Sequence, residues 1–218
     1  MSHPTKALRK KRSTLPRGTP AATRLPRGRH DLSRDEVTAS QRLRMLTAMA
    51  DAMTELGYVN TPVAEIIKRA GVSRETFYQQ FSSKQDCFVA ALEVTIEHLT
   101  VALTPGLTSD GSALDRFDRA VTSYLENLET NPATARLFLI ETYAAGPDVM
   151  RRRLELQRRF VDGIAGIFDA TTPSRRFACE AMVAAIIALV TARFVEDRVT
   201  GLAELREPLI ELAGQLLD

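Results

Sequence analysis

The stretch TPVAEIIKRAGVSRETFYQQFSSK, from Thr61 to Lys84, decides the fold of this chain. Its first half has apolar residues at helical spacing, and Thr61 with Pro62 predicts a helix start, with Thr61 as the cap. Gly71 stands where a helix often ends in a left-handed residue. Ser73 predicts the N-cap of a second helix over residues 74–80. Two short helices joined by a glycine turn are typical of a helix-turn-helix, whose second helix enters the major groove of DNA.

The composition of the second helix agrees with this interpretation. Val72, Phe77 and Phe81 predict an inward face. The outer and flanking positions are Arg74, Glu75, Thr76, Tyr78, Gln79 and Gln80. Arg and Gln can each form paired contacts with base edges, and Thr and Tyr hydroxyls reach phosphates or bases. A solvated amphipathic helix has a similar polar face, but the spacing and the cationic Lys84 at the start of the next helix favour DNA.

These residues also carry a resemblance to a known family. The order Thr61-Pro62-Val63, Ala70-Gly71-Val72-Ser73 and Thr76-Phe77-Tyr78, then Phe81 and Lys84, resembles the DNA-binding signature of the TetR/AcrR family of bacterial regulators. Two positions depart from the usual family pattern, Ile67 (often Ala) and Gln80 (often His), and they concern the DNA sequence that is read. The resemblance implies an all-α homodimer, in which a three-helix DNA-binding domain precedes a helical ligand-binding and dimerisation domain. It also implies that the final two helices pair with those of the partner as a four-helix bundle.

Charge is distributed unevenly along the chain. The net charge is +2, yet residues 1–34 hold ten Lys and Arg against the single acid Asp31, which leaves 19 bases and 26 acids, or −7, for the remainder. Two cysteines in apolar context predict buried thiols, and three scattered histidines show no zinc-ligand spacing. We therefore expect a basic arm on an acidic body, with no metal and no cofactor.

The arm over residues 1–32 is expected to be disordered, because four prolines and few apolar residues oppose a packed helix. The same prolines argue against an amphipathic transit peptide. Pro26-Arg27-Gly28-Arg29 resembles the core of an AT-hook, in which Arg27 and Arg29 would enter a narrow minor groove. A solvated tail that attracts phosphates without specificity is the competing interpretation.

Ser33 with Glu36 predicts a capping box and a first helix that ends at Leu56-Gly57. We expect this helix to brace the helix-turn-helix and to present Arg42 and Arg44 to the phosphate backbone, or to solvent alone. The complete predicted DNA-contacting set is Arg27, Arg29, Arg42, Arg44, Thr61, Arg74, Glu75, Thr76, Tyr78, Gln79, Gln80 and Lys84.

Several amphipathic helices are predicted in the C-terminal two thirds. A capping box of Ser82 and Gln85 opens a helix closed by Pro105-Gly106. Further helices are expected over residues 113–129, 133–145 and 148–170. Thr172 or Ser174 is expected to open the next helix, which runs to about Val199, and a last helix is expected from about Arg206. In the helix over 148–170 Leu154 belongs to the core stripe, and the arginines at 151–153 and 158–159 form a solvated face.

The helix before the last is apolar on every side between Cys179 and Val195. Glu180, Thr191 and Arg193 make it too short and too polar for a membrane span. A helix that is apolar all round must be covered all round, and a second copy of the chain is the natural cover. The predicted dimer contacts are Ala181, Ala185, Ala188, Ala192, Leu205, Leu209, Leu212 and Leu216.

The sequence shows no glycine-rich phosphate loop and no nucleophile motif, so we expect no enzyme. The domains are expected at 1–32, 33–82 and 83–218. The expected function is a cytoplasmic, nucleoid-associated repressor that binds a palindromic operator as a homodimer and is released by a small apolar ligand. The alternative is a ligand-independent helix-turn-helix protein with an architectural or co-regulatory role, in which no apolar cavity is needed. Candidate ligand contacts are Phe88, Leu92, Phe117, Arg136, Phe138, Glu141, Tyr143, Phe160 and Met182, each of which could equally be ordinary core.

Overall fold

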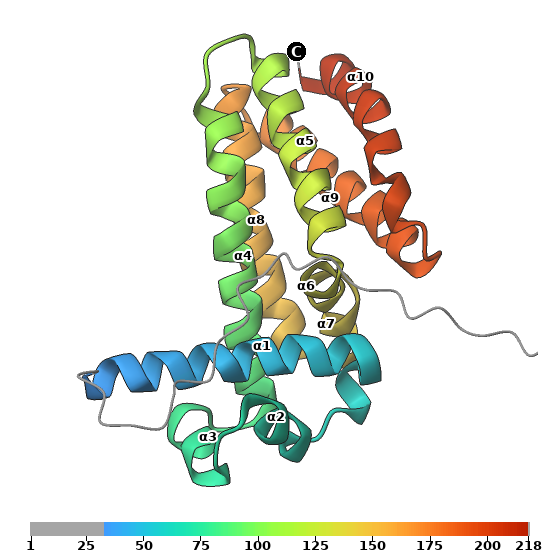
Figure 1. Cartoon of the computed structure of the whole chain (residues 1–218). Helices are drawn as coiled ribbons and strands as arrows, with labels where there is room; N and C mark the ends of the chain where they lie inside the picture. The colour runs from blue at the N-terminus through green and yellow to red at the C-terminus, as the bar shows by residue number, and fades with distance from the viewer. Residues whose placement is uncertain (1–32, 218) are drawn as a thin grey trace, which may run out of the picture.

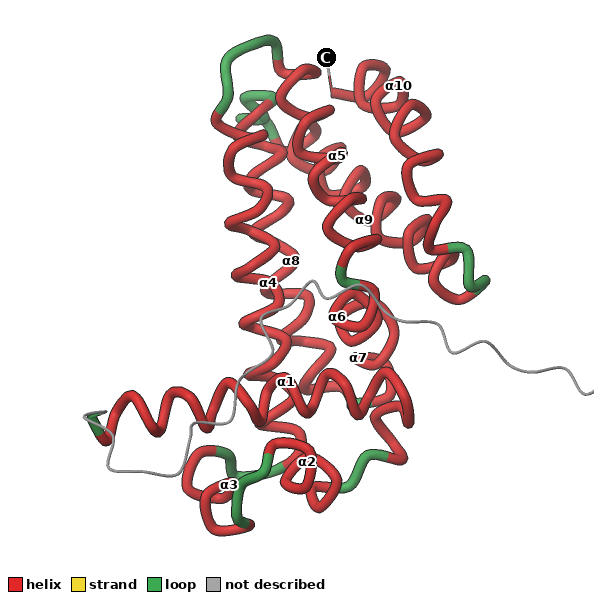
Figure 2. Tube along the Cα trace, in the orientation of Figure 1, coloured by secondary structure: helices red, strands yellow, loops and turns green. Residues whose placement is uncertain are grey.

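The computed structural model describes residues 33–217, all of whose regular elements are helices (Figures 1 and 2). The expected arm over 1–32, with Arg27 and Arg29, lies outside the described residues. The helices are α1 (Arg34–Asn60), α2 (Val63–Ala70), α3 (Arg74–Gln80), α4 (Lys84–Thr108), α5 (Ala113–Thr130), α6 (Pro132–Arg136), the π-helix η1 (Leu137–Glu141), α7 (Thr142–Ala144), α8 (Pro147–Ile167), α9 (Pro173–Val195), the 3₁₀-helix η2 (Val199–Leu205) and α10 (Arg206–Leu217). The all-α prediction is confirmed.

Helices α2 and α3 lie below α1, and α4 rises from them into a bundle with α5, α8, α9 and α10 (Figure 1). The predicted capping box of Ser33 and Glu36 starts α1. Gly71 adopts the left-handed conformation at φ 63° and ends α2, and Ser73 caps α3 by accepting from the Thr76 amide. Phe77 of α3 and Phe81, directly after it, are buried on the inner side of this helix. Local sequence signals therefore set the helix-turn-helix.

Two helix boundaries differ from the prediction. Thr61 does not cap α2; its hydroxyl instead donates to the Gly57 carbonyl at 2.7 Å, because Gly57 (φ 73°) bends the end of α1 back towards it. Ser82 donates to Asp86 rather than joining a capping box with Gln85, and Ser83 is the N-cap of α4.

Helix α4 continues through Pro105 to Thr108, so the prediction that Pro105-Gly106 closes it was wrong. The reason lies in Gly106, where α4 and α5 approach closely. A Cβ atom at Gly106 would lie 2.8 Å from the Ala120 nitrogen and 3.0 Å from the Arg119 carbonyl carbon. This contact holds the last turn of α4 against α5, although Pro105 removes one backbone hydrogen bond.

The helix expected over 133–145 is present but contains η1, whose wider turn the sequence did not indicate. In α8, Leu154 is exposed and Arg153 is buried, which corrects both predictions for this helix. The two differ by one position, which on a helix is a rotation of about 100°. Helix α9 is capped by Thr172 and ends at Val195, and α10 begins at Arg206 as expected.

One hydrophobic core runs from Met45 in α1 to Leu217 in α10 and includes both cysteines. Two of its helices, α4 and α9, are long and apolar enough to cross a membrane by length and composition, which corrects the expectation for α9. This is weak evidence for a membrane span, since the core helices of globular proteins pass the same test, and α4 packs against α1, α5 and α8.

Candidate nucleic-acid interface and internal cavity

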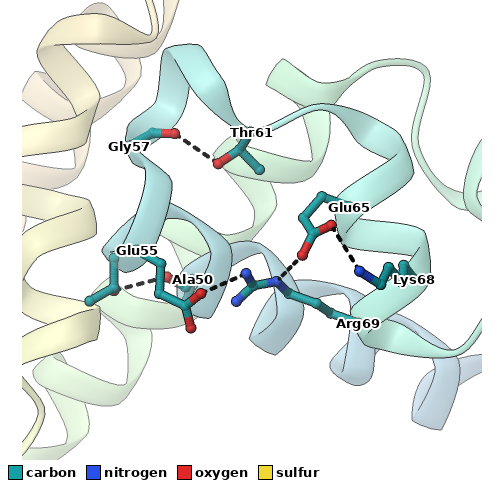
Figure 3. A network of polar contacts seen from close by, with 8 residues as sticks. Ala50, Glu55, Gly57, Thr61, Glu65, Lys68 and Arg69 are labelled. Atoms are coloured by element: carbon teal, nitrogen blue, oxygen red, sulfur yellow. Dashed lines mark hydrogen bonds and ion pairs between the residues drawn. The ribbon is translucent and has the colours of Figure 1, made fainter.

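An ionic network fixes α2 against α1 (Figure 3). The guanidinium of Arg69 donates to Glu65 on its own helix at 2.8 Å and to Glu55 on α1 at 2.7 Å. The hydrogen bonds from Arg69 lower the pKa of both carboxyl groups. Because the pairs are partly exposed, the network is more important for orienting α2 than for stability.

Two arginines of α1 brace the helix-turn-helix from above. Arg44 donates to the Ala70 carbonyl at 2.7 Å and so satisfies the end of α2. Arg42 lies over the Phe81 ring at 4.5 Å and makes a long contact of 3.5 Å with the Gln80 carbonyl. Arg42 remains exposed and free to meet a phosphate, whereas Arg44 is half-buried and committed to α2.

Four of the predicted contact residues of α3 form one exposed face: Arg74, Glu75, Tyr78 and Gln79. Their spacing of i, i+1, i+4 and i+5 places them on one side of the helix. The guanidinium of Arg74 lies 5.3 Å from the Tyr78 ring centre, and Gln79 donates to Glu75 at 3.3 Å. Hydrogen-bonding groups suited to base edges are therefore presented together on one surface.

Four other predicted contact residues have partners inside the fold. Thr61 is fully buried, so its side chain cannot contact DNA. Gln80 faces α1, where it donates to the Thr38 carbonyl at 3.4 Å, and Thr76 pairs with Ser73 at the cap of α3. Lys84 donates to the Tyr58 carbonyl at 2.7 Å and lies over the Tyr58 ring, and burial lowers the pKa of its ammonium group.

The helices above α1 line an apolar cavity of about 80 Å³ that is partly open to solvent. It is lined by α4, α5, η1, α8 and α9 through Thr100, Leu103, Leu107, Phe117, Ala120, Val121, Tyr124, Phe138, Arg159, Phe160, Gly163, Ile164, Val183, Ile186 and Ile187. Arg159 is its one charged lining residue among those described, and this side chain is half-exposed and pairs with Glu97 of α4 at 3.3 Å. The cavity therefore reaches the surface between α4 and α8.

Three of the nine predicted ligand contacts, Phe117, Phe138 and Phe160, line this cavity. The others do not. Phe88, Leu92 and Met182 are packed in the core. Tyr143 is 62% exposed, and Arg136 lies outside the lining. Periodicity identifies inward faces but not which inward residues leave space, so Tyr124 and the α9 isoleucines were missed.

Glu141 faces the helix-turn-helix rather than the cavity. Its carboxylate accepts from the Tyr58 amide at 2.6 Å, directly after the bend at Gly57. Phe138, one turn earlier in η1, lines the cavity. The π-helix therefore contacts both the cavity and the end of α1.

One face of α9 is exposed although it is apolar. Ala181, Ala188 and Ala192 are exposed and Ala185 is half-buried, and Phe177, at 70% exposure, and Val195 extend the same face. In the last helix the prediction was partly wrong. Leu205 and Leu209 are buried within the chain, Leu212 is half-buried and Leu216 is exposed. Leu205 belongs to η2, so the inward stripe of α10 is Leu209, Ala213 and Leu217 instead.

Comparison with known proteins identifies similar sequences. The profile of the bacterial regulatory proteins of the tetR family matches residues 46–91. The HTH-type transcriptional activator FasR of Mycolicibacterium smegmatis is 30% identical over 118 residues, 54% of this chain and 52% of FasR. The chain thus spans about half the length of the first curated relatives it matches.

Solved structures share the fold over most of the chain. The transcriptional regulator FadR from Bacillus subtilis, solved in complex with stearoyl-CoA, superposes with a TM-score of 0.68 at 16% identity, covering 81% of this chain and 97% of FadR. A TetR-like transcriptional regulator from Rhodococcus sp. RHA1 gives a TM-score of 0.62 at 21% identity, covering 88% and 98%. At these identities the likeness shows the fold alone.

Proposed function

We propose that this chain, whose residues 46–91 match the profile of the tetR family of bacterial regulatory proteins, is a cytoplasmic, DNA-binding transcriptional regulator of that family. It binds a palindromic operator as a homodimer, and a small ligand with an apolar chain releases it as a repressor. The N-terminal segment to residue 82 binds DNA, and the helices that follow bind the ligand and the partner.

The observation that carries DNA recognition is the exposed face of Arg74, Glu75, Tyr78 and Gln79. Behind it, Phe77 and Phe81 anchor α3 in the core, and Arg42, Arg44 and Arg69 hold the surrounding helices. A short helix on a rigid support, with base-reading side chains outward, can enter a major groove without rearrangement.

Gln79→Ala and Arg74→Ala should each weaken binding to the best operator by about 1–3 kcal/mol and to random duplex only slightly. Neither side chain supports the fold, so the melting temperature should stay unchanged. Fluorescence anisotropy on a duplex selected from a random pool measures both affinities. Gln215→Ala, an exposed glutamine on α10, is the matched control. Equal losses on selected and random DNA would show that α3 only positions the protein.

The cavity supports a ligand with an apolar chain, because its lining is almost entirely hydrocarbon. The fold is shared with FadR, whose solved complex contains stearoyl-CoA. The volume of about 80 Å³ is smaller than the roughly 150 Å³ apolar cavity that admits benzene. A chain can therefore enter only if the surrounding helices separate, and a ligand that binds the separated arrangement shifts the protein towards it.

The π-helix η1 connects the helices that surround the cavity with the DNA-binding helices. Displacing Phe138 at the cavity moves the segment whose Glu141 holds the Tyr58 amide at the end of α1. π-Helical segments often occur at functional sites. We propose that ligand entry changes the position of α1 and, through it, of α3.

Gly163→Val should fill the cavity and leave DNA binding intact. A Cβ there meets the Leu107 side chain at an ordinary 3.5 Å, so the larger side chain occupies space that the ligand needs. Overpacking of about 1–3 kcal/mol predicts a loss of roughly 5- to 150-fold in acyl-CoA affinity. Calorimetry with saturated acyl-CoAs of increasing length measures it, together with operator release by anisotropy.

Gly166→Val is the matched control, because no atom lies within 4 Å of its Cβ position and it lines no part of the cavity. If the two variants bind acyl-CoA equally, the cavity is not the ligand site. If neither acyl-CoAs nor free fatty acids change operator affinity, the proposal of a ligand with an apolar chain is wrong and the ligand-independent alternative gains support.

A further inference from the structure

Two buried polar groups near the Phe138 end of the cavity have no partner. The hydroxyl of Tyr124 and the Nη2 atom of Arg153 are each shielded from solvent and make no hydrogen bond in the described part of the chain. Tyr124 lines the cavity from α5, while Arg153 projects from α8 against the ring of Phe138, 4.9 Å from its centre. Buried polar groups are almost always satisfied, so two orphans in one region need an explanation.

Arg153 is the more unusual of the two, since its side chain is only 3% exposed. Its Nε donates to the Phe138 carbonyl at 3.2 Å, and the Phe138 and Tyr143 rings lie against its guanidinium. Among residues 33–217 no carboxylate lies within 4.0 Å of it, although every other arginine of the run 151–153 has an acidic partner. A buried cation without a counter-charge is costly, and an anion that binds beside it removes that cost.

The geometry brings the two groups into one region, because Tyr124 and Phe138 line the same cavity and the Arg153 guanidinium lies over the Phe138 ring. Burial lowers the pKa of Arg153, and burial raises the pKa of Tyr124 while the nearby Arg153 charge opposes that rise. Each group therefore influences the other's ionisation. A guanidinium with a free N–H and a phenol with a free O–H are both donors, and together they match an oxyanion.

We propose that Tyr124, which lines the cavity, and Arg153, which lies behind Phe138, form an anion-binding subsite that becomes accessible when a ligand displaces Phe138. The subsite receives a free carboxylate at the end of an apolar chain, as in a fatty acid. This inference rests on the proposed function, which places a ligand in the cavity. The hydrocarbon then extends along Phe117 and Phe160 towards the surface beside Arg159. Because Arg153 also holds the Phe138 carbonyl of η1, the anion reaches the same segment that contacts α1.

Decanoate and 1-decanol test the subsite, because they share a chain and differ in the charge of the head group. Isothermal calorimetry with the full-length protein should give decanoate a roughly 10- to 100-fold lower Kd, as expected for hydrogen bonds to charged groups. Arg153→Met should remove this preference, since methionine keeps much of the volume without the charge.

Tyr124→Phe keeps the test independent of folding. It deletes a hydroxyl that has no partner in the free protein, so the melting temperature should stay or rise, while decanoate binding weakens by roughly threefold to tenfold. Opposite signs of the two effects would not arise from a purely structural tyrosine.

The outcomes distinguish a failure of the anion subsite from a failure of the proposed cavity ligand. If both compounds bind wild-type protein equally, or if Arg159→Met instead of Arg153→Met abolishes the preference, the subsite is overturned and the cavity ligand stands. If neither compound binds, the cavity is not a site for apolar chains, which overturns the ligand part of the proposed function and this subsite with it.

Discussion

Replacing Ala188 with glutamate is expected to give a folded monomer that has lost most of its affinity for a two-half-site operator. Ala188 lies in the middle of the exposed face of α9, with Ala181 and Ala192 on either side. In the proposed dimer this face meets its own copy, and small side chains allow the helices to approach closely. A glutamate there would bury two unpaired carboxylates at the symmetry axis.

The expected loss follows from bivalency. Two linked half-site contacts exceed a single contact by roughly 10²- to 10⁴-fold, so that factor should disappear while binding to random DNA falls far less. Since Ala188 is exposed in the single chain, the substitution should leave the helical circular dichroism spectrum unchanged. Sedimentation velocity measures the oligomeric state and anisotropy measures the affinity.

Val101→Glu is the control, because Val101 is also an exposed apolar residue but lies on α4. It should remain dimeric with unchanged operator binding. An Ala188→Glu protein that still sediments as a dimer would rule out this face of α9 as the interface.

Gly106→Ala is expected to destabilise the protein by about 2 kcal/mol. The new Cβ would lie between 2.8 and 3.1 Å from three backbone atoms of Arg119 and Ala120, and backbone atoms in a helix cannot move aside cheaply. Overpacking of this kind costs about 1–3 kcal/mol, more than the roughly 0.5–1 kcal/mol that alanine gains over glycine in a helix. Helices α4 and α5 must therefore move apart.

Gly166→Ala is a control for which the opposite change in stability is expected. Gly166 is also helical, but its Cβ position is open, so alanine should stabilise the protein by roughly 0.5–1 kcal/mol. Urea and thermal unfolding of both variants measure the difference. A Gly106→Ala protein as stable as Gly166→Ala would mean that the α4–α5 contact is looser than the structure indicates.

The DNA-binding helices were predictable because their signals are local. Ser33, Ser73 and Gly71 each satisfy backbone groups within a few residues, so sequence spacing is sufficient evidence for them. The exposed face of α3 follows from the same periodicity. The separation of Thr61 and Gln80 from that face does not follow from periodicity. Gln80 donates to the Thr38 carbonyl, 42 positions away in the sequence, and Thr61 turns inward because Gly57 bends the end of α1.

Other features were missed because they depend on contacts between segments that are far apart in the sequence. Pro105 normally ends a helix, and only the contact between Gly106 and α5 explains why α4 continues. Arg153 lies in an arginine-rich run that resembles a solvated face. Its position on the inner side of α8, however, buries it against Phe138. Whether an inward aromatic lines a cavity or fills the core depends on volumes set by five elements together.

The exposed apolar face of α9 makes operator binding depend on the concentration of the protein in the cell. If chains pair through Phe177, Ala181 and Ala188, the fraction of chains in the operator-binding form depends on their total concentration. At levels below the dimer dissociation constant, the dimer concentration varies with the square of the chain concentration. A change in gene dosage or protein turnover would then change operator occupancy more than in proportion to the chain concentration, even before any ligand is present.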